Sequence, residues 1–148
     1  MGNSIHIGEN MRQIYSKIDP ELLLHIVHEF DDFEDGRTDL VDENQFIQLS
    51  ALQMKEGKTF KPHKHIFKAG ERCCIAQESW VVLKGWVKVY FYDIDDTLLE
   101  EVKLEEGDCS ITLQGGHNYE ILEEGTRVLE FKTGPYKGQE MDKVFIDD

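Results

Sequence analysis

Cysteine is scarce in this sequence, with three residues in 148. Cys73 and Cys74 are neighbours in the chain, Cys109 leaves the count odd, and no CxxC pair occurs. This arrangement excludes a disulfide framework, because neighbouring cysteines rarely pair with each other and an odd count leaves one thiol over. We therefore expect a protein of a reducing cytoplasm.

Basic residues are also few. Sixteen lysines and arginines stand against thirty aspartates and glutamates, which gives a formal net charge of −14. A surface that binds nucleic acid or an anionic membrane needs an excess of lysine and arginine. The composition therefore argues against both partners and describes a self-repelling, soluble surface.

Long apolar runs are missing. No run approaches the length of a membrane span, and the first residues, MGNSIHIGENMRQ, lack the apolar centre of a signal peptide. His6 stands where a myristoylation signal needs serine or threonine. We expect no contact with a membrane.

The chain has the length of one domain, and its hydrophobic content of 40% suffices for a buried core. We divide it into an N-terminal helical extension, residues 1–40, and a barrel with a C-terminal tail, residues 41–148. In the extension, Asp19-Pro20 precedes ELLLHIVHEF. Aspartate suits a helix N-cap and proline the first helical position, so we predict a short helix from Pro20 to Phe30.

After residue 41 the pattern changes to short apolar segments that end at glycines. Runs rich in β-branched and aromatic residues favour strands. The predicted extended segments are 44–57, TFKPHKHIF, IAQESWVVLKG, WVKVYFYDID, LLEEVKLEEGD, CSITLQ, HNYEILEEG and 126–134. We expect IAQESWVVLKG and WVKVYFYDID to form a hairpin at Lys84-Gly85. Short strands at regular intervals predict an all-β antiparallel sandwich or barrel.

His63 and His65 stand two apart in an extended segment. Alternate residues of a strand point to the same face, so both imidazoles aim into one space. With Glu78 and His117 from separate strands they make a plausible ligand set for a divalent transition metal. The alternative is a pair of surface histidines, which is how we interpret His25 and His28.

The spacing of these residues resembles the cupin superfamily, small jelly-roll barrels with a metal site inside. Gly57, KTFKP and His63-Lys64-His65 match the front of its first motif, and Glu78, SWVVLK and Gly85 match the back. The second motif runs from Gly107-Asp108 to His117. Twelve residues, Ile66 to Gln77, separate His65 from Glu78 where the family has three or four. Gln77 replaces Glu78 as a ligand only if this loop shifts the register.

The resemblance implies a single jelly-roll barrel and one divalent metal, which is iron, manganese, nickel or zinc. Its ligands would be His63, His65, Glu78 and His117. Four further residues are candidates for the surrounding pocket: Trp80, Arg72, Tyr90 and Tyr119. The Trp80 indole either packs in the core or stacks on a ligand. Arg72, in the inserted loop, either pairs with an anionic group or is simply solvated.

The segment GPYKGQEMDKVFI and the run Gly115-Gly116-His117 are similar to small cupins of surface-polysaccharide and nucleotide-sugar biosynthesis. Three functions stay open: a metal-dependent enzyme for a small molecule such as a sugar derivative, a binding protein that leaves its ligand unchanged, and a structural-metal protein that works through a protein partner. Sugar epimerisation ranks below metal chemistry, because histidines occupy the metal positions. Related barrels commonly pair, so we expect a homodimer.

Overall fold

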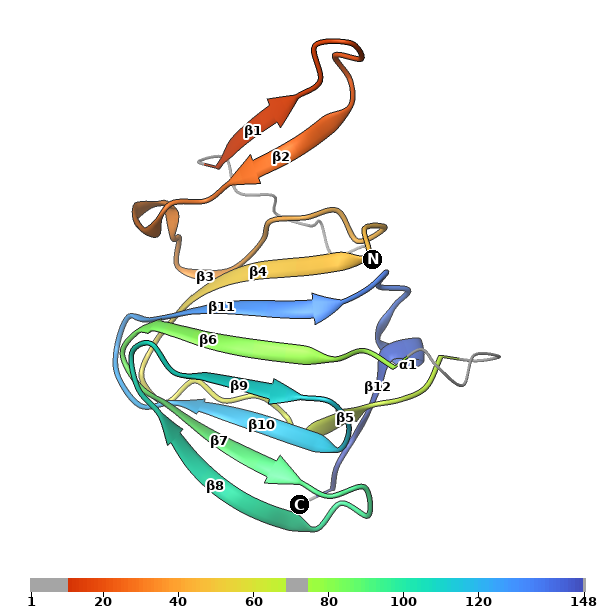
Figure 1. Ribbon diagram of the computed structural model, residues 1–148. Helices are drawn as coiled ribbons and strands as arrows, with labels where there is room; N and C mark the ends of the chain where they lie inside the picture. The colour runs from red at the N-terminus through yellow and green to blue at the C-terminus, as the bar shows by residue number, and fades with distance from the viewer. Residues whose placement is uncertain (1–10, 69–74, 148) are drawn as a thin grey trace.

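The computed structural model describes residues 11–68 and 75–147, and antiparallel strands dominate it (Figure 1). Two five-stranded sheets form a sandwich. In spatial order, the first sheet contains β3 (Gly36–Asp39), β4 (Ile47–Met54), β11 (Thr126–Thr133), β6 (Glu78–Lys84) and β9 (Cys109–Thr112). The second contains β12 (Lys143–Phe145), β5 (His63–His65), β10 (Gly116–Ile121), β7 (Val87–Tyr92) and β8 (Leu98–Leu104). The all-β prediction is confirmed.

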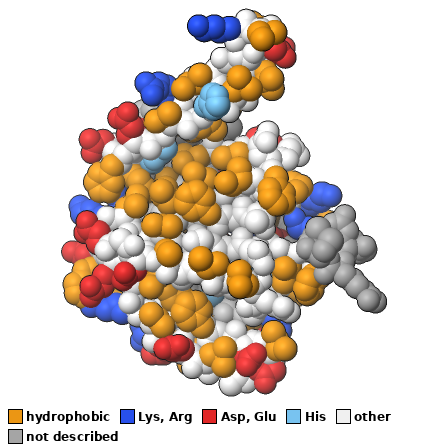
Figure 2. Space-filling model, in the orientation of Figure 1, with side chains coloured by type: hydrophobic (Ala, Val, Ile, Leu, Met, Phe, Trp, Pro, Cys, Tyr) orange, Lys and Arg blue, Asp and Glu red, His pale blue; other side chains and the backbone are white. Residues whose placement is uncertain are grey.

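The strands alternate in burial as the sequence predicts. Along β6, Glu78, Trp80 and Val82 are buried and the residues between them are partly exposed. The outward side of the first sheet is nevertheless apolar, since Ile111 on β9 is 64% exposed and Leu129 and Phe131 on β11 are partly buried. Figure 2 shows hydrophobic side chains gathered across this face.

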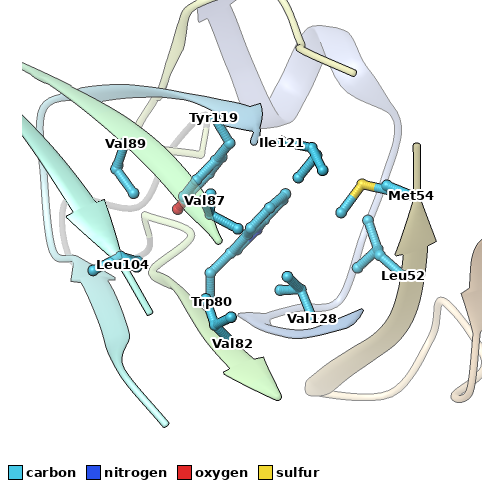
Figure 3. Close-up of a cluster of buried hydrophobic side chains, with 10 residues drawn as sticks. All are labelled: Leu52, Met54, Trp80, Val82, Val87, Val89, Leu104, Tyr119, Ile121 and Val128. Atoms are coloured by element: carbon cyan, nitrogen blue, oxygen red, sulfur yellow. The ribbon is translucent and has the colours of Figure 1, made fainter. Parts of the chain in front are cut away.

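The core lies between the two sheets. Figure 3 shows side chains from β4, β6 and β11 meeting those from β7, β8 and β10. At its centre the Trp80 and Tyr119 rings stack at 3.7 Å between centroids, with an interplanar angle of 2°. Burial of such large aromatic surfaces is a main source of stability in a sandwich of this size.

The predicted hairpin at Lys84-Gly85 is wrong. β6 pairs with β11 and β9, and β7 pairs with β10 and β8, so the chain passes from one sheet to the other at Gly85. Gly85 has a φ of 85°, and a Cβ atom there would lie 2.3 Å from Thr126 Oγ1. Only glycine fits this close approach without strain.

The predicted N-terminal helix is also wrong. β1 (Arg12–Tyr15) and β2 (Leu23–Val27) form a hairpin that projects from the sandwich, followed by a 3₁₀ turn at Phe30–Asp32 (Figure 1). Asp19 and Pro20 start a β-turn, in which Leu22 N donates to Asp19 O at 3.0 Å. Aspartate and proline suit the first positions of a turn as well as a helix start, and pairing with β1 decides between them.

The described α-helix lies near the C-terminus: α1 (Gln139–Asp142) leads directly into β12. β12 pairs with β5, so the predicted tail contributes a strand to the second sheet, and β3 adds one before residue 41. In residues 11–68 and 75–147, neither helical segment has the length and apolar character needed to cross a bilayer.

Candidate metal centre

Four buried side chains meet at one end of the sandwich. His63 on β5 lies opposite His117 on β10, and His65 stands two residues along on the same inward face. Glu78 opens β6 in the facing sheet, so the group draws on both sheets. One ligand atom from each residue can be chosen such that all four lie within 4.8 Å of one another.

The Nδ1 atom of each histidine lies close to a polar group outside the cluster. His63 Nδ1 lies 2.9 Å from the carbonyl oxygen of Lys61, and a carbonyl can only accept, so this nitrogen carries the proton. His117 Nδ1 lies 2.8 Å from Thr112 Oγ1. His65 Nδ1 lies 3.3 Å from a carboxylate oxygen of Asp142, within ion-pair distance but without hydrogen-bond geometry. The Nε2 atoms are thereby left for the interior of the cluster.

The Nε2 atom of His65 is buried without a hydrogen-bond partner in the described part of the chain, and that of His117 faces the Glu78 carboxylate within the cluster. A buried polar atom without a partner is costly, and such atoms call for an explanation. Three imidazoles beside one carboxylate form a donor set suited to a divalent transition metal, so the residues fit the predicted group.

The charges inside the cluster are strongly coupled. His117 Nε2 lies 2.8 Å from Glu78 Oε2. Burial raises the pKa of Glu78, but the hydrogen bond and charge of His117 outweigh it, so the net pKa falls to about 2. Burial and the nearby His117 lower the pKa of His63 to about 4. Near neutral pH, His63 is therefore uncharged and Glu78 ionised, the forms that bind a metal.

A cavity of about 360 Å³ adjoins the cluster, with His63 and Glu78 in its wall. Opposite them, Glu130 on β11 accepts hydrogen bonds from Trp80 Nε1 at 3.0 Å and from Arg37 at 2.7 Å. Arg37 also bonds Asp39 at 2.9 Å. These contacts fix one wall of the cavity as a paired polar network.

The predicted pocket residues have different fates. Trp80 and Tyr119 line the cavity while stacking on each other, so Trp80 serves both the core and the wall. Tyr90 is not among the residues that line the cavity. Its hydroxyl donates a hydrogen bond to Glu120 at 2.7 Å, and Glu120 does not line the cavity either. Gln77 is exposed, whereas Glu78 points inward. Arg72 lies outside the described residues.

The sequence analysis missed the contributions of the C-terminal segment. Asp142 is buried beside His65 and also lies 3.3 Å from Lys132 Nζ. Lys143 and Tyr136 line the cavity. The acidic and basic character of EMDK was visible in the sequence, but only the pairing of β12 with β5 brings it to the histidines.

No family model and no curated protein matches this sequence. Solved structures do. A cupin-2 domain protein from Shewanella frigidimarina NCIMB 400 aligns with a TM-score of 0.51 and 16% identity, over 73% of this chain and 95% of that one. The chain has the cupin fold.

Two other solved structures align with the same fold. The capsular polysaccharide assembling protein CapF from Staphylococcus aureus aligns with a TM-score of 0.60 and 19% identity, over 76% of this chain and 32% of its own. KdgF from Halomonas sp. aligns with a TM-score of 0.52 and 19% identity, over 68% of this chain and 78% of its own. The predicted resemblance to cupins is therefore confirmed at the level of the fold.

Proposed function

We propose that this protein is a metal-binding cupin whose cavity receives a small molecule at the metal. His63, His65, Glu78 and His117 hold one divalent transition metal. The observation that carries the proposal is the convergence of these four groups within 4.8 Å, with each histidine Nδ1 close to a group outside the cluster. An ion that accepts about six ligands would keep about two positions for water or a ligand.

When bound, the metal would supply Lewis acidity to an oxygen-bearing ligand. The chain's own residues shape the rest of the site. Glu130 and Arg37 hold the polar wall, and the Trp80–Tyr119 stack closes the apolar side. The likeness to CapF, a capsular polysaccharide assembling protein, supports a sugar derivative as the ligand and surface-polysaccharide metabolism as the setting.

Metal analysis tests the ligand set. The purified wild-type protein should hold about one metal ion per chain, and the His63→Ala, His65→Ala double variant should lose most of it, because two of four donors are gone. His25→Ala serves as the matched control, since this exposed histidine lies on the β1–β2 hairpin. Full metal content in the double variant would contradict the proposal.

Open coordination separates a ligand-binding centre from a purely structural one. Protein loaded with Mn²⁺ should accelerate water-proton relaxation, and addition of 3-isopropenyl-tropolone, the inhibitor in a CapF structure, should reverse this by displacing bound water. Relaxation equal to that of metal-free protein would instead indicate a closed, structural ion.

The apolar outward face of the first sheet supports a homodimer. Ile111 of β9 is 64% exposed there, and it registers through Ser79 of β6 with partly buried Phe131 of β11. Figure 2 shows hydrophobic side chains gathered on this face. Contiguous exposed apolar surface of this kind is typical of protein interfaces. A second copy of the chain, presenting the same face, would cover it symmetrically.

A further inference from the structure

Four carboxylates in and beside the cavity have partners within the protein, whereas Glu43, which also lines it, is exposed. Glu130 and Asp39 both pair with Arg37, at 2.7 and 2.9 Å. Asp142 is 3.3 Å from both Lys132 and His65. Glu78 lies 2.8 Å from His117. These carboxylates therefore leave little capacity to neutralise a further cation in the wall.

Lys143 is a cation of the cavity wall that has no ion-pair partner in the described part of the chain. It lies on β12 directly beside His65 of β5, and its side chain lines the cavity. Among residues 11–68 and 75–147 it has neither a hydrogen bond nor an ion pair, although it is partly buried. Burial lowers the pKa of Lys143 and the charge of neighbouring Lys132 lowers it further, while Asp142, Glu78 and Glu130 raise it in part without forming an ion pair with it. Lys132 itself is engaged, by Asp142 and by the Tyr136 ring at 4.7 Å.

Tyr136 offers a second unused polar group. Its ring lies under Lys132, and its backbone N–H donates to Glu43 O at 2.9 Å. Within the described chain its hydroxyl has no hydrogen-bond partner, and the residue lines the same cavity as Lys143. Both residues are partly buried, so their polar groups are free to bind a ligand that enters the cavity.

A divalent metal would remove the net negative charge in and beside the cavity. Three cationic and four anionic side chains line it: Arg37, Lys132, Lys143, Asp39, Glu43, Glu78 and Glu130. Asp142, which pairs with Lys132, adds a fifth carboxylate beside the lining, so a divalent ion would bring the total from two negative charges to zero. The volume of about 360 Å³ is at the small end of ligand sites, which suits a single sugar-sized acid better than a nucleotide sugar.

We propose that Lys143, assisted by the Tyr136 hydroxyl, binds the carboxylate of a small hydroxy or keto acid whose other oxygen atoms reach the metal. The inference rests on the proposed function for the metal end of the ligand and adds a charge-recognition site at the other end. It assigns to the cavity a preference for a carboxylic acid over a neutral sugar of the same size.

Hydroxamic acids with a terminal carboxylate, in a series of increasing chain length, test this site. The hydroxamate binds the metal, and the carboxylate is compared with its methyl ester by calorimetric titration of Zn²⁺-loaded protein. For at least one chain length the acid should bind about tenfold or more tightly than the ester, as expected for a hydrogen-bonded charged group. In Lys143→Met this ratio should fall to about one, with metal content and ester affinity unchanged.

Two further variants keep the test decisive. Lys64→Met is the matched control, since Lys64 adjoins the histidines in sequence but pairs with Asp96 at 2.6 Å; it should retain the full ratio. Tyr136→Phe should reduce the ratio partly and serves if Lys143→Met fails to fold. Metal-loaded protein that binds ester and acid equally overturns this inference alone, whereas protein that retains no metal overturns the proposed function and the inference together.

Discussion

At the scale of single residues, the three clustered histidines differ in what lies at Nδ1. A backbone carbonyl lies beside His63, a hydroxyl beside His117, and the carboxylate of Asp142 beside His65. A carboxylate near the far nitrogen of an imidazole increases its basicity and fixes its ring, which strengthens metal binding. Asp142 is therefore the residue outside the ligand set with the largest expected effect on the metal.

Replacing Asp142 with asparagine should weaken metal binding by about 10–100-fold, because the uncharged amide no longer supports the His65 ring electrostatically. Competition with a chromophoric chelator measures the affinity. Glu140→Gln is the control, as it removes a carboxylate of the same helix from an exposed position. Equal affinities for the two variants would show that Asp142 does not act through His65.

The stability of the metal-free protein should fall as the pH drops from about 6.5 towards 5. His63 is neutral in the folded protein, with a pKa of about 4, whereas an unfolded histidine titrates near 6.5. Between these values the unfolded state binds more protons, so acid favours unfolding, by at most about 1.4 kcal/mol per pH unit. The pKa values of Glu78 and Asp142, both about 2, place their own contributions at lower pH.

Thermal melting of chelator-treated protein across this range measures the effect. His63→Gln should flatten the dependence, and His25→Gln should leave it unchanged because that side chain is exposed. If the melting temperature of wild type and of His63→Gln changed equally with pH, a group other than His63 would take up the proton on unfolding.

At the scale of elements, the passage between the sheets depends on a single glycine. Gly85 combines a φ of 85° with a backbone that leaves no room for a side chain against Thr126. Gly57 has a similar φ of 82°, but within the described residues a Cβ atom there would meet nothing within 4 Å. A comparison of Gly85 with Gly57 therefore separates the cost of a positive φ from the cost of a steric clash with Thr126.

Gly85→Ala should destabilise the fold by about 2–5 kcal/mol, the sum of left-handed strain and overpacking. Gly57→Ala should cost about 1–2 kcal/mol, since only the strain applies. Denaturant unfolding gives both values. If the two variants lost the same stability, the close approach at Thr126 would have no energetic weight.

At the scale of the whole molecule, the N-terminal hairpin and the outward face of the first sheet leave apolar surface uncovered. Part of that face is covered by its own chain, since Met11, Phe33, Leu40 and Ala51 form a second buried cluster. The β9 side lies beyond this cluster, with Ile111 well exposed. A homodimer through this side would bury it.

Light scattering should give a mass about twice that of the 17.2 kDa chain. Ile111→Lys should raise the dimer dissociation constant by about tenfold or more, because a charge at the centre of an apolar interface is costly. Ile94→Lys is the control, since Ile94 is also 64% exposed but lies in the β7–β8 turn. A monomer mass at all concentrations would contradict the dimer.

Much of the fold and the convergence of the three histidines with Glu78 could be predicted from the sequence because the relevant information is local. Alternation along a strand determines that His63 and His65 share a face, and that Glu78, Trp80 and Val82 share another. Glycines mark the ends of the strands. These features depend on backbone geometry over a few residues, so they do not depend on which strands become neighbours.

The tertiary structure decided which strands are neighbours. Local preferences left Pro20–Phe30 free to become either helix or strand, and pairing with β1 selected the strand. β6 and β7 join different sheets, although a hairpin was compatible with their sequence. Asp142 and Lys143 reach the histidines only because β12 adds to β5. Such pairings depend on which surfaces can be buried together across distant parts of the chain, and a pattern within one segment does not contain that information.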